Sequence, residues 1–210
     1  MTYDAIILRL AGPMQAWGAP TTEDIRPVYP FPTRSGLTGL IGACLGVTHE
    51  ERHRLVPLSE SFRYAVRRDT GPFEPGIMVD YQTIQNVPTA DNKTRTVESP
   101  REYLVDTRFT AVLVATGVGS PSFDEIERAL LEPHFTPVLG RKCCLPTEPI
   151  FVRRAAPDNP LTLLAETAPG SGYVWSEFAR TGAGTIEVRD VPTAHFRRCY
   201  TRTVHVFQEN

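Results

Sequence analysis

The segment of residues 71–100 is the sequence feature that most limits which folds this chain can adopt. It carries two glycines and four prolines around a strand-like piece at 77–84. It is too long for an ordinary loop in a compact domain, where most connections have about 4–6 residues. We therefore expect an extended hairpin or arm that projects from the domain.

The rest of the N-terminal part alternates apolar, β-branched runs with segments of helical period. Residues 11–18 are expected to form a loop, and Thr33 or Ser35 to cap the first helix. Strands are expected at 3–10, 62–68, 108–115 and near 149–152, and helices at 33–45 and 123–131. The order strand, helix, strand, arm, strand, helix, strand predicts an α+β, ferredoxin-like fold, as in RNA-recognition modules. Additional C-terminal β-strands are expected at 172–175, 185–188 and 203–207.

Charge and cysteine content exclude several classes of protein. The net charge of −2, from 22 basic and 24 acidic residues, argues against a uniformly basic polyanion binder. Twenty of the basic residues are arginines, which suits phosphate contacts but equally fits an arginine-favouring genome. The four cysteines show no CxxC spacing, so no metal site is expected. With no signal peptide and no apolar run near the roughly 20 residues that cross a bilayer, we expect a reducing, cytoplasmic setting.

Catalytic motifs are absent from the sequence. His49 and His53 lie four residues apart, but charged neighbours make a solvated helical turn the simpler interpretation. No HExxH, nucleophile elbow, GxGxxG or P-loop occurs. The residues therefore indicate neither a catalytic centre nor a cofactor.

Two segments near the N-terminus have the chemistry of a nucleic-acid site. Thr33, Arg34, Ser35 and Gly36 place hydroxyls, a guanidinium and free amides at a helix start, where phosphate can bind. A plain N-cap with a surface arginine explains them equally well. Gln15 and Trp17 follow the first strand, and Trp17 is either a stacking platform for a base or a lid on the core.

The arm and a later turn add aromatic and basic groups. Tyr81 and Thr83 lie in the arm with Lys93, Arg95 and Arg101, a mixture typical of single-stranded RNA contacts. A solvated hairpin is the alternative. The turn at 139–142 brings two cations, Arg141 and Lys142, to flexible backbone amides that could hold a phosphate.

Five of these strings occur in the order and approximate spacing of one family. They are LRLAGPMQAWG at 8–18, FPTRSG at 31–36, DYQT at 80–83, PREYL at 100–104 and LGRK at 139–142. Over residues 3 to about 152 the chain closely resembles the Cas-five family, in particular the subunit of Cascade, the type I-E CRISPR surveillance complex. The last 55 residues match no motif.

The resemblance implies the shape of a right hand. It divides the chain into an RNA-recognition-like palm at 1–75 and 108–155, a β-hairpin thumb at 76–107, and a C-terminal β segment at 156–210 packed on the palm.

The resemblance also implies a noncatalytic RNA-binding role. Such subunits cap the 5′ handle of the CRISPR RNA, contact an adjacent backbone subunit and help dock the large subunit that reads the PAM; target DNA near the PAM is a further candidate partner, and a membrane is not. Matching strings make the following residues candidates for holding the handle: Gln15, Trp17, Thr33, Arg34, Ser35, Gly36, Tyr81, Thr83, Arg101, Arg141 and Lys142. Lys93 and Arg95 join them on charge alone.

Two alternatives stay open at this point. Type I-C relatives are metal-independent endoribonucleases that process precursor CRISPR RNA, a reaction that needs a group able to exchange a proton. Related type I-E sequences commonly have His at the position of Gln82, and glutamine cannot play that part. The other alternative is a structural bridge whose contact with RNA is incidental.

Overall fold

The chain folds into a mixed α/β structure with one antiparallel sheet. The computed structural model describes residues 2–70, 76–91, 93–167, 172–193 and 199–209. The strands are β1 (Ala5–Gln15), β2 (Phe62–Asp69), β3 (Gly76–Pro88), β4 (Thr94–Ala115), β5 (Phe151–Ala155), β6 (Gly172–Ser176), β7 (Gly184–Pro192) and β8 (Cys199–Glu209). The helices are α1 (Arg34–Cys44), α2 (Leu55–Glu60), α3 (Phe123–Leu131) and α4 (Pro160–Thr167), with a short 3-10 turn η1 (Arg52–Arg54) before α2. Their strand order is β5-β1-β4-β2-β6-β8-β7, and β3 pairs with β4 outside this path.

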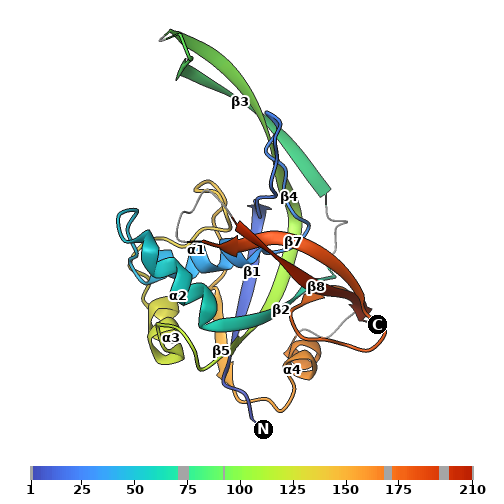
Figure 1. Cartoon of the computed structure of the whole chain (residues 1–210). Coiled ribbons are helices and arrows are strands. Elements are labelled where there is room, and N and C mark those ends of the chain that lie inside the picture. The colour runs from blue at the N-terminus through green and yellow to red at the C-terminus, as the bar shows by residue number, and fades with distance from the viewer. Residues whose placement is uncertain (1, 71–75, 92, 168–171, 194–198, 210) are drawn as a thin grey trace.

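Strand β4 belongs both to the sheet and to the projecting arm. Its C-terminal part lies between β1 and β2, with Ala5 opposite Val114 and Phe62 opposite Ala115. Its N-terminal part pairs with β3, with Gly76 opposite Val105. We call the paired β3 and outer β4 the β3–β4 ribbon, which extends away from the sheet (Figure 1). The hairpin expected from residues 71–100 is therefore present.

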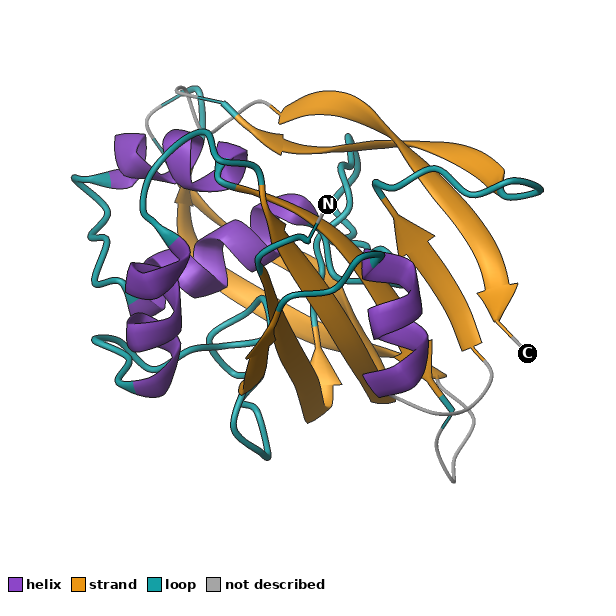
Figure 2. Cartoon of the chain, turned by 90° about the horizontal axis from the view of Figure 1, so that it is seen from below, coloured by secondary structure: helices purple, strands orange, loops and turns teal. Residues whose placement is uncertain are grey.

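Side chains on both faces of the sheet are buried. The larger core lies between the sheet and helices α1, α2 and α3, and includes Leu8, Leu10 and Ile41 (Figure 2). The smaller core lies on the other face under α4, and includes Ile7 and Leu164. Because β1 is covered on both faces, its residues are apolar without strict alternation.

Helices α1 and α3 each begin at a side-chain cap. Thr33 caps α1 by accepting a hydrogen bond from the amide of Gly36 at 3.2 Å. Ser122 and Glu125 form a capping box at the start of α3, each accepting from the other's backbone amide.

Two expectations about secondary structure were wrong. Residues 11–15 continue strand β1, where Met14 lies opposite Val105 and Gln15 opposite Leu104. The partner residues, Leu104 and Val105, belong to β4 and lie about 90 positions later. Gly12 and Pro13 are typical of a turn, so the local sequence does not indicate that the strand continues. Helix α4 occupies a region where only strands were expected, because its eight residues are too few to show a clear helical period.

Candidate nucleic-acid interface

Four of the five strings singled out in the sequence meet where the ribbon leaves the sheet. The amide of Ala16 donates to the carbonyl of Leu139 at 2.9 Å. Gly36 packs so closely on Trp17 that an added Cβ would lie 2.6 Å from the indole ring. We call residues 18–30 the N-terminal strap, because they run from this point along the base of the ribbon (Figure 1). Backbone pairing of Arg26 with Arg101 joins the strap to β4.

Gln15 and Trp17 are fully buried beneath this junction. The amide nitrogen of Gln15 donates to the carbonyls of Leu10 at 3.1 Å and Thr107 at 2.6 Å. Its amide oxygen accepts from the indole N–H of Trp17 at 3.0 Å. Trp17 is therefore a lid on the core in this structure, and its ring offers no exposed face to a base.

The start of α1 is occupied by a carboxylate from the chain itself. The backbone amide of Arg34 donates to Oδ2 of Asp190 at 2.7 Å. Asp190 is 1% exposed and lies in β7, 156 residues further along the chain. An anion favours this end of a helix, and Asp190 supplies it. Thr33 thus matches the plain N-cap interpretation.

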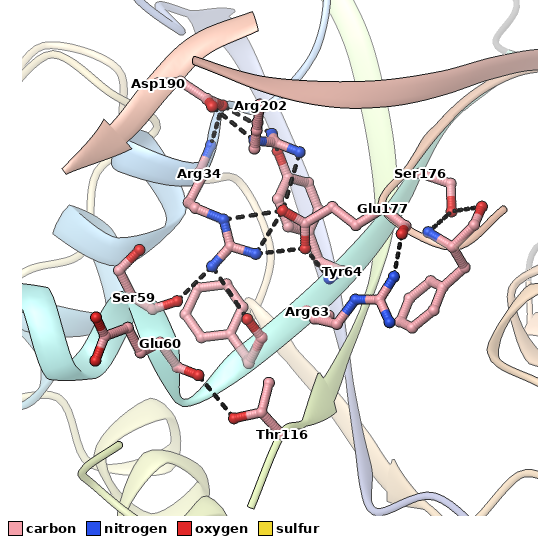
Figure 3. A network of polar contacts seen from close by, with 12 residues as sticks. Arg34, Ser59, Glu60, Arg63, Tyr64, Thr116, Ser176, Glu177, Asp190 and Arg202 are labelled. Atoms are coloured by element: carbon pink, nitrogen blue, oxygen red, sulfur yellow. Dashed lines mark hydrogen bonds and ion pairs between the residues drawn. The ribbon is translucent and has the colours of Figure 1, made fainter. Parts of the chain in front are cut away.

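The guanidinium of Arg34 is also turned inward. It forms a buried ion pair with Glu177 and donates to the carbonyls of Ser59 and Phe62 (Figure 3). With 7% of the residue exposed, Arg34 is not presented to a phosphate. The surface arginine expected at this position is a buried residue.

Arg202 completes a buried network that we call the Glu177 cluster, made of Arg34, Tyr64, Glu177, Asp190 and Arg202 (Figure 3). Nε of Arg202 donates to Asp190 at 2.7 Å, and its Nη1 lies 2.9 Å from Glu177. Burial raises the pKa of the Tyr64 phenol, which donates as a neutral group to the carbonyl of Pro32 at 3.0 Å. Two cations balance two carboxylates, so the cluster joins α1 to the C-terminal strands without a net buried charge.

Arg141 fastens the N-terminal strap to the ribbon. Its Nη1 donates to the carbonyl of Glu102 at 2.9 Å and its Nη2 to that of Arg26 at 3.1 Å. The guanidinium lies over the ring of Tyr103, 4.5 Å from its centre. The next residue, Lys142, is exposed. The turn at 139–142 therefore offers one exposed cation, while Arg141 is held by backbone.

The ribbon carries the remaining candidates along its length. Tyr81 is 66% exposed, and its hydroxyl donates to Glu98 at 3.2 Å. Thr83 and Arg95 are exposed, and Lys93 forms an exposed ion pair with Asp91. These residues lie along the ribbon and at its tip, outside the junction where the four strings meet.

Arg101 stands at the base of the ribbon, half-buried and opposite Asp80 in register. Its Nε is buried and has no hydrogen-bond partner within the described part of the chain.

We expect Arg141→Lys to loosen the strap, because an ammonium cannot donate to two carbonyls in the fixed fork of a guanidinium. The free energy of unfolding should fall by about 1–2 kcal/mol. Hydrogen exchange at the amide of Arg26, which donates to the carbonyl of Pro100 at 2.8 Å, should become faster. Lys142→Ala is the control and should leave that exchange unchanged; equal exchange in wild type and Arg141→Lys would contradict the fastening role.

Sequence reasoning missed the C-terminal contribution to this region. Glu177, Asp190 and Arg202 lie in a segment without any recognised motif, and their partners are remote in sequence. The one signal that could have identified Asp190 is its burial, which the local sequence pattern does not reveal.

Among the described residues, no group of three or more His, Cys, Asp or Glu side chains is arranged to hold a metal ion. In the same part of the chain, no helix has the length and apolar character needed to span a membrane.

Comparison with known proteins places this chain among CRISPR-associated proteins. A family model described as "CRISPR-associated protein (Cas_Cas5)" matches residues 5–207. The chain therefore belongs to this family, and the C-terminal segment without recognised motifs lies within the match.

One curated relative and two solved structures extend the comparison. The chain is 39% identical over 191 residues to "CRISPR system Cascade subunit CasD" of Escherichia coli (strain K12), covering 84% of this chain and 83% of the relative. It is 29% identical, with a TM-score of 0.74, to a chain of a "CRISPR RNA-guided surveillance complex", over 97% of this chain and 89% of that one. A structure described as "Crystal structure of Cas protein" shares the fold at 24% identity and a TM-score of 0.61, over 98% and 93% of the two chains.

Proposed function

We propose that the chain is the subunit of a type I-E Cascade complex that binds and caps the 5′ handle of the CRISPR RNA without cutting it. The observation that carries the proposal is the 39% identity to Cascade subunit CasD across more than four fifths of both chains. The likeness in fold to a chain of an RNA-guided surveillance complex supports it.

The proposal includes a ferredoxin-like palm with a hairpin thumb. The sheet order β5-β1-β4-β2, with α1 after β1 and α3 after β4, supports this assignment. The division into a palm at 1–75 and 108–155, a thumb at 76–107 and a C-terminal segment at 156–210 is proposed with it. The contacts of the Glu177 cluster support packing of that last segment on the palm.

The candidate residues divide by exposure into two roles. The buried ones, with Gly36 and Arg141, are proposed to position the junction: Gln15, Trp17, Thr33 and Arg34. The accessible ones are proposed to contact phosphates and bases: Ser35, Tyr81, Thr83, Lys93, Arg95, Arg101 and Lys142. Phosphate contacts would supply affinity, and splayed handle bases would supply specificity.

Further partners are proposed on the same basis. These are an adjacent backbone subunit, the large subunit that reads the PAM and target DNA near the PAM, within the cytoplasm.

The state of the ribbon side chains supports a noncatalytic role. The hydrogen bond to Glu98 raises the pKa of the Tyr81 phenol, which opposes formation of a phenolate base at neutral pH. Gln82 has no titratable group, and its amide donates to Asp80 at 2.7 Å. These two neighbours therefore provide poor means of activating a 2′-hydroxyl.

The test removes two accessible cations at the base of the ribbon. In Arg101→Ala/Lys142→Ala, we expect less retention of handle-containing RNA with the assembled complex. The slope of log affinity against log salt should decrease by roughly 0.7 for each lost phosphate contact with a single strand. Competition binding at several salt concentrations measures both quantities.

The matched control is Arg128→Ala/Arg153→Ala, which removes two exposed cations outside the ribbon and makes the same change in net charge. Equal RNA retention by both double variants would contradict the proposed surface. Normal assembly on RNA without the handle sequence would favour a structural bridge instead. Site-specific cleavage of repeat RNA by the purified chain in EDTA would contradict the noncatalytic role.

A further inference from the structure

A pocket beside the start of α1 contains an arginine that the sequence did not single out. The pocket has a volume of about 430 Å³, within the roughly 300–1,000 Å³ of small-molecule sites. It is lined by Gly18, Ala19, Pro20, Thr21, Ser35, Arg189 and Cys199. These residues come from the N-terminal strap, from α1 and from the β7–β8 pair. Of these described lining residues, Arg189 alone carries a full charge.

The backbone and its neighbours hold Arg189 in place. A bulge in β7 lies between Arg189 and Val191, and a bulge can re-aim the side chains beside it. Asp190 is buried in the Glu177 cluster, whereas Arg189 is exposed. Nε of Arg189 donates to the carbonyl of Cys199 at 3.1 Å, and its backbone amide lies 3.5 Å from the Tyr29 hydroxyl.

This arrangement leaves the forked end of the guanidinium available. Among the described residues no carboxylate lies within ion-pair distance of Arg189. The carboxylate of its neighbour Asp190 interacts instead with Arg34 and Arg202. Two parallel N–H donors suit a phosphate, and they bind it with defined orientation. The amides at the start of α1 are not needed, because Asp190 and Thr33 already accept from those of Arg34 and Gly36.

The remaining lining suits the sugar attached to a phosphate. Thr21 and Ser35 present hydroxyl groups, and Pro20 presents an apolar ring. Single-stranded RNA offers such a unit at each nucleotide, with a 2′-hydroxyl as an added hydrogen-bond partner.

We propose that this pocket holds one backbone phosphate and its ribose from the 5′ handle of the CRISPR RNA, with Arg189 as the phosphate ligand. The inference rests on the proposed function, and it assigns a contact to the C-terminal segment. The strap and β7–β8 thus enclose one nucleotide, while the ribbon contacts others.

Cys199 gives a direct test because its half-buried thiol lines the pocket. The full chain is treated with N-ethylmaleimide in buffer, with handle-containing RNA or with inorganic phosphate, and labelling of Cys199 is followed by peptide mass spectrometry. Burial raises the pKa of this thiol, so slow labelling in buffer is expected. RNA should slow it several-fold further, and inorganic phosphate at the same concentration should not.

Substitutions of Arg189 provide the second measurement. Arg189→Ala should weaken binding of handle RNA by about 10-fold or more, as expected for loss of charge-assisted hydrogen bonds. Arg189→Lys should restore only part of the affinity, because it keeps the charge but not the fork. Arg153→Ala, an exposed arginine in β5 outside this pocket, is the control and should bind as wild type does.

The outcomes separate this inference from the proposed function. If wild type binds handle RNA while Cys199 labels at an unchanged rate and Arg189→Ala binds equally well, the pocket assignment is overturned and the proposed function stands. Protection by inorganic phosphate but not by RNA indicates a free-anion site and also overturns the assignment. Failure of wild type and of the assembled complex to bind the handle overturns both. The labelling of wild type decides the question even if Arg189→Ala does not fold.

Discussion

Replacement of Glu177 by alanine is expected to lower the free energy of unfolding by about 3–5 kcal/mol, the usual effect of breaking a buried ion pair. The Glu177 carboxylate faces Arg34 and Arg202, and it also accepts from the backbone amide of Tyr64 at 2.9 Å. Its removal leaves two buried guanidiniums with one remaining carboxylate, Asp190. The loss should therefore exceed that of a surface ion pair several times over.

Urea denaturation followed by circular dichroism measures the change in the free energy of unfolding. If a variant is too unstable to purify, its yield of soluble protein is compared with that of wild type. Glu177→Gln keeps the volume and removes the charge, so it should also be destabilised. Glu187→Ala, which removes an exposed glutamate of β7 bound to Thr203, is the control and should change stability by about 0.5 kcal/mol or less. Similar stabilities for Glu177→Ala and Glu187→Ala would show that the Glu177 cluster does not hold the fold.

Gly140→Ala is expected to have the second large effect, because two independent costs combine there. Gly140 has a φ of +98°, outside the range that side-chain-bearing residues favour. An added Cβ would also overlap the carbonyl of Ala16, and that backbone is fixed by the buried Gln15 and Trp17 beside it. The turn at 139–142 would have to move away from the base of the ribbon.

Gly182→Ala isolates the backbone-strain part of this effect. Gly182 has a φ of +82°, but apart from its two chain neighbours no atom of the described residues lies within 4 Å of an added Cβ. It should cost about 1–2 kcal/mol from backbone strain alone. Gly140→Ala should cost about 1–3 kcal/mol more through overpacking, and it should weaken RNA retention while Gly182→Ala does not. Equal melting temperatures for the two variants would contradict this prediction, because they would show that the turn at 139–142 accommodates the added Cβ without a further loss of stability.

Elements whose causes are local were predictable from the sequence. Pro121 and Ser122 before the segment, and Asp124 and Glu125 in its first turn, predicted α3 at Phe123–Leu131, as the structure has it. The prolines and glycines at 71–100 showed that a hairpin was needed, since no compact loop suits that length. The extension of β1 to Gln15 was not predictable, because its partner Leu104 is supplied by a strand almost 90 positions away.

The candidate site was less predictable than the fold for a related reason. Residue type made Arg34 a candidate phosphate ligand, but its inward orientation depends on Glu177, 143 positions later. Trp17 is likewise buried by contacts that its own segment does not reveal, because Gly36 of α1 packs on its indole ring. Arg189 had no motif around it, and its availability follows from the bulge in β7 and from its contact with Cys199. Hydrogen-bond partners brought together by the fold therefore decided which polar residues remain accessible.

The unbroken course of β4 has a mechanical consequence. Its 22 residues pass from the tip of the arm into the middle of the sheet without an intervening loop. The hydrogen bonds of β4 with β1 and β2 therefore connect the arm directly to the middle of the sheet. One strand is thus shared by the arm and the sheet, so the direction of the arm in an assembly constrains the orientation of the sheet, and Asp106, with a φ of +53° at their junction, is where the angle between them is set.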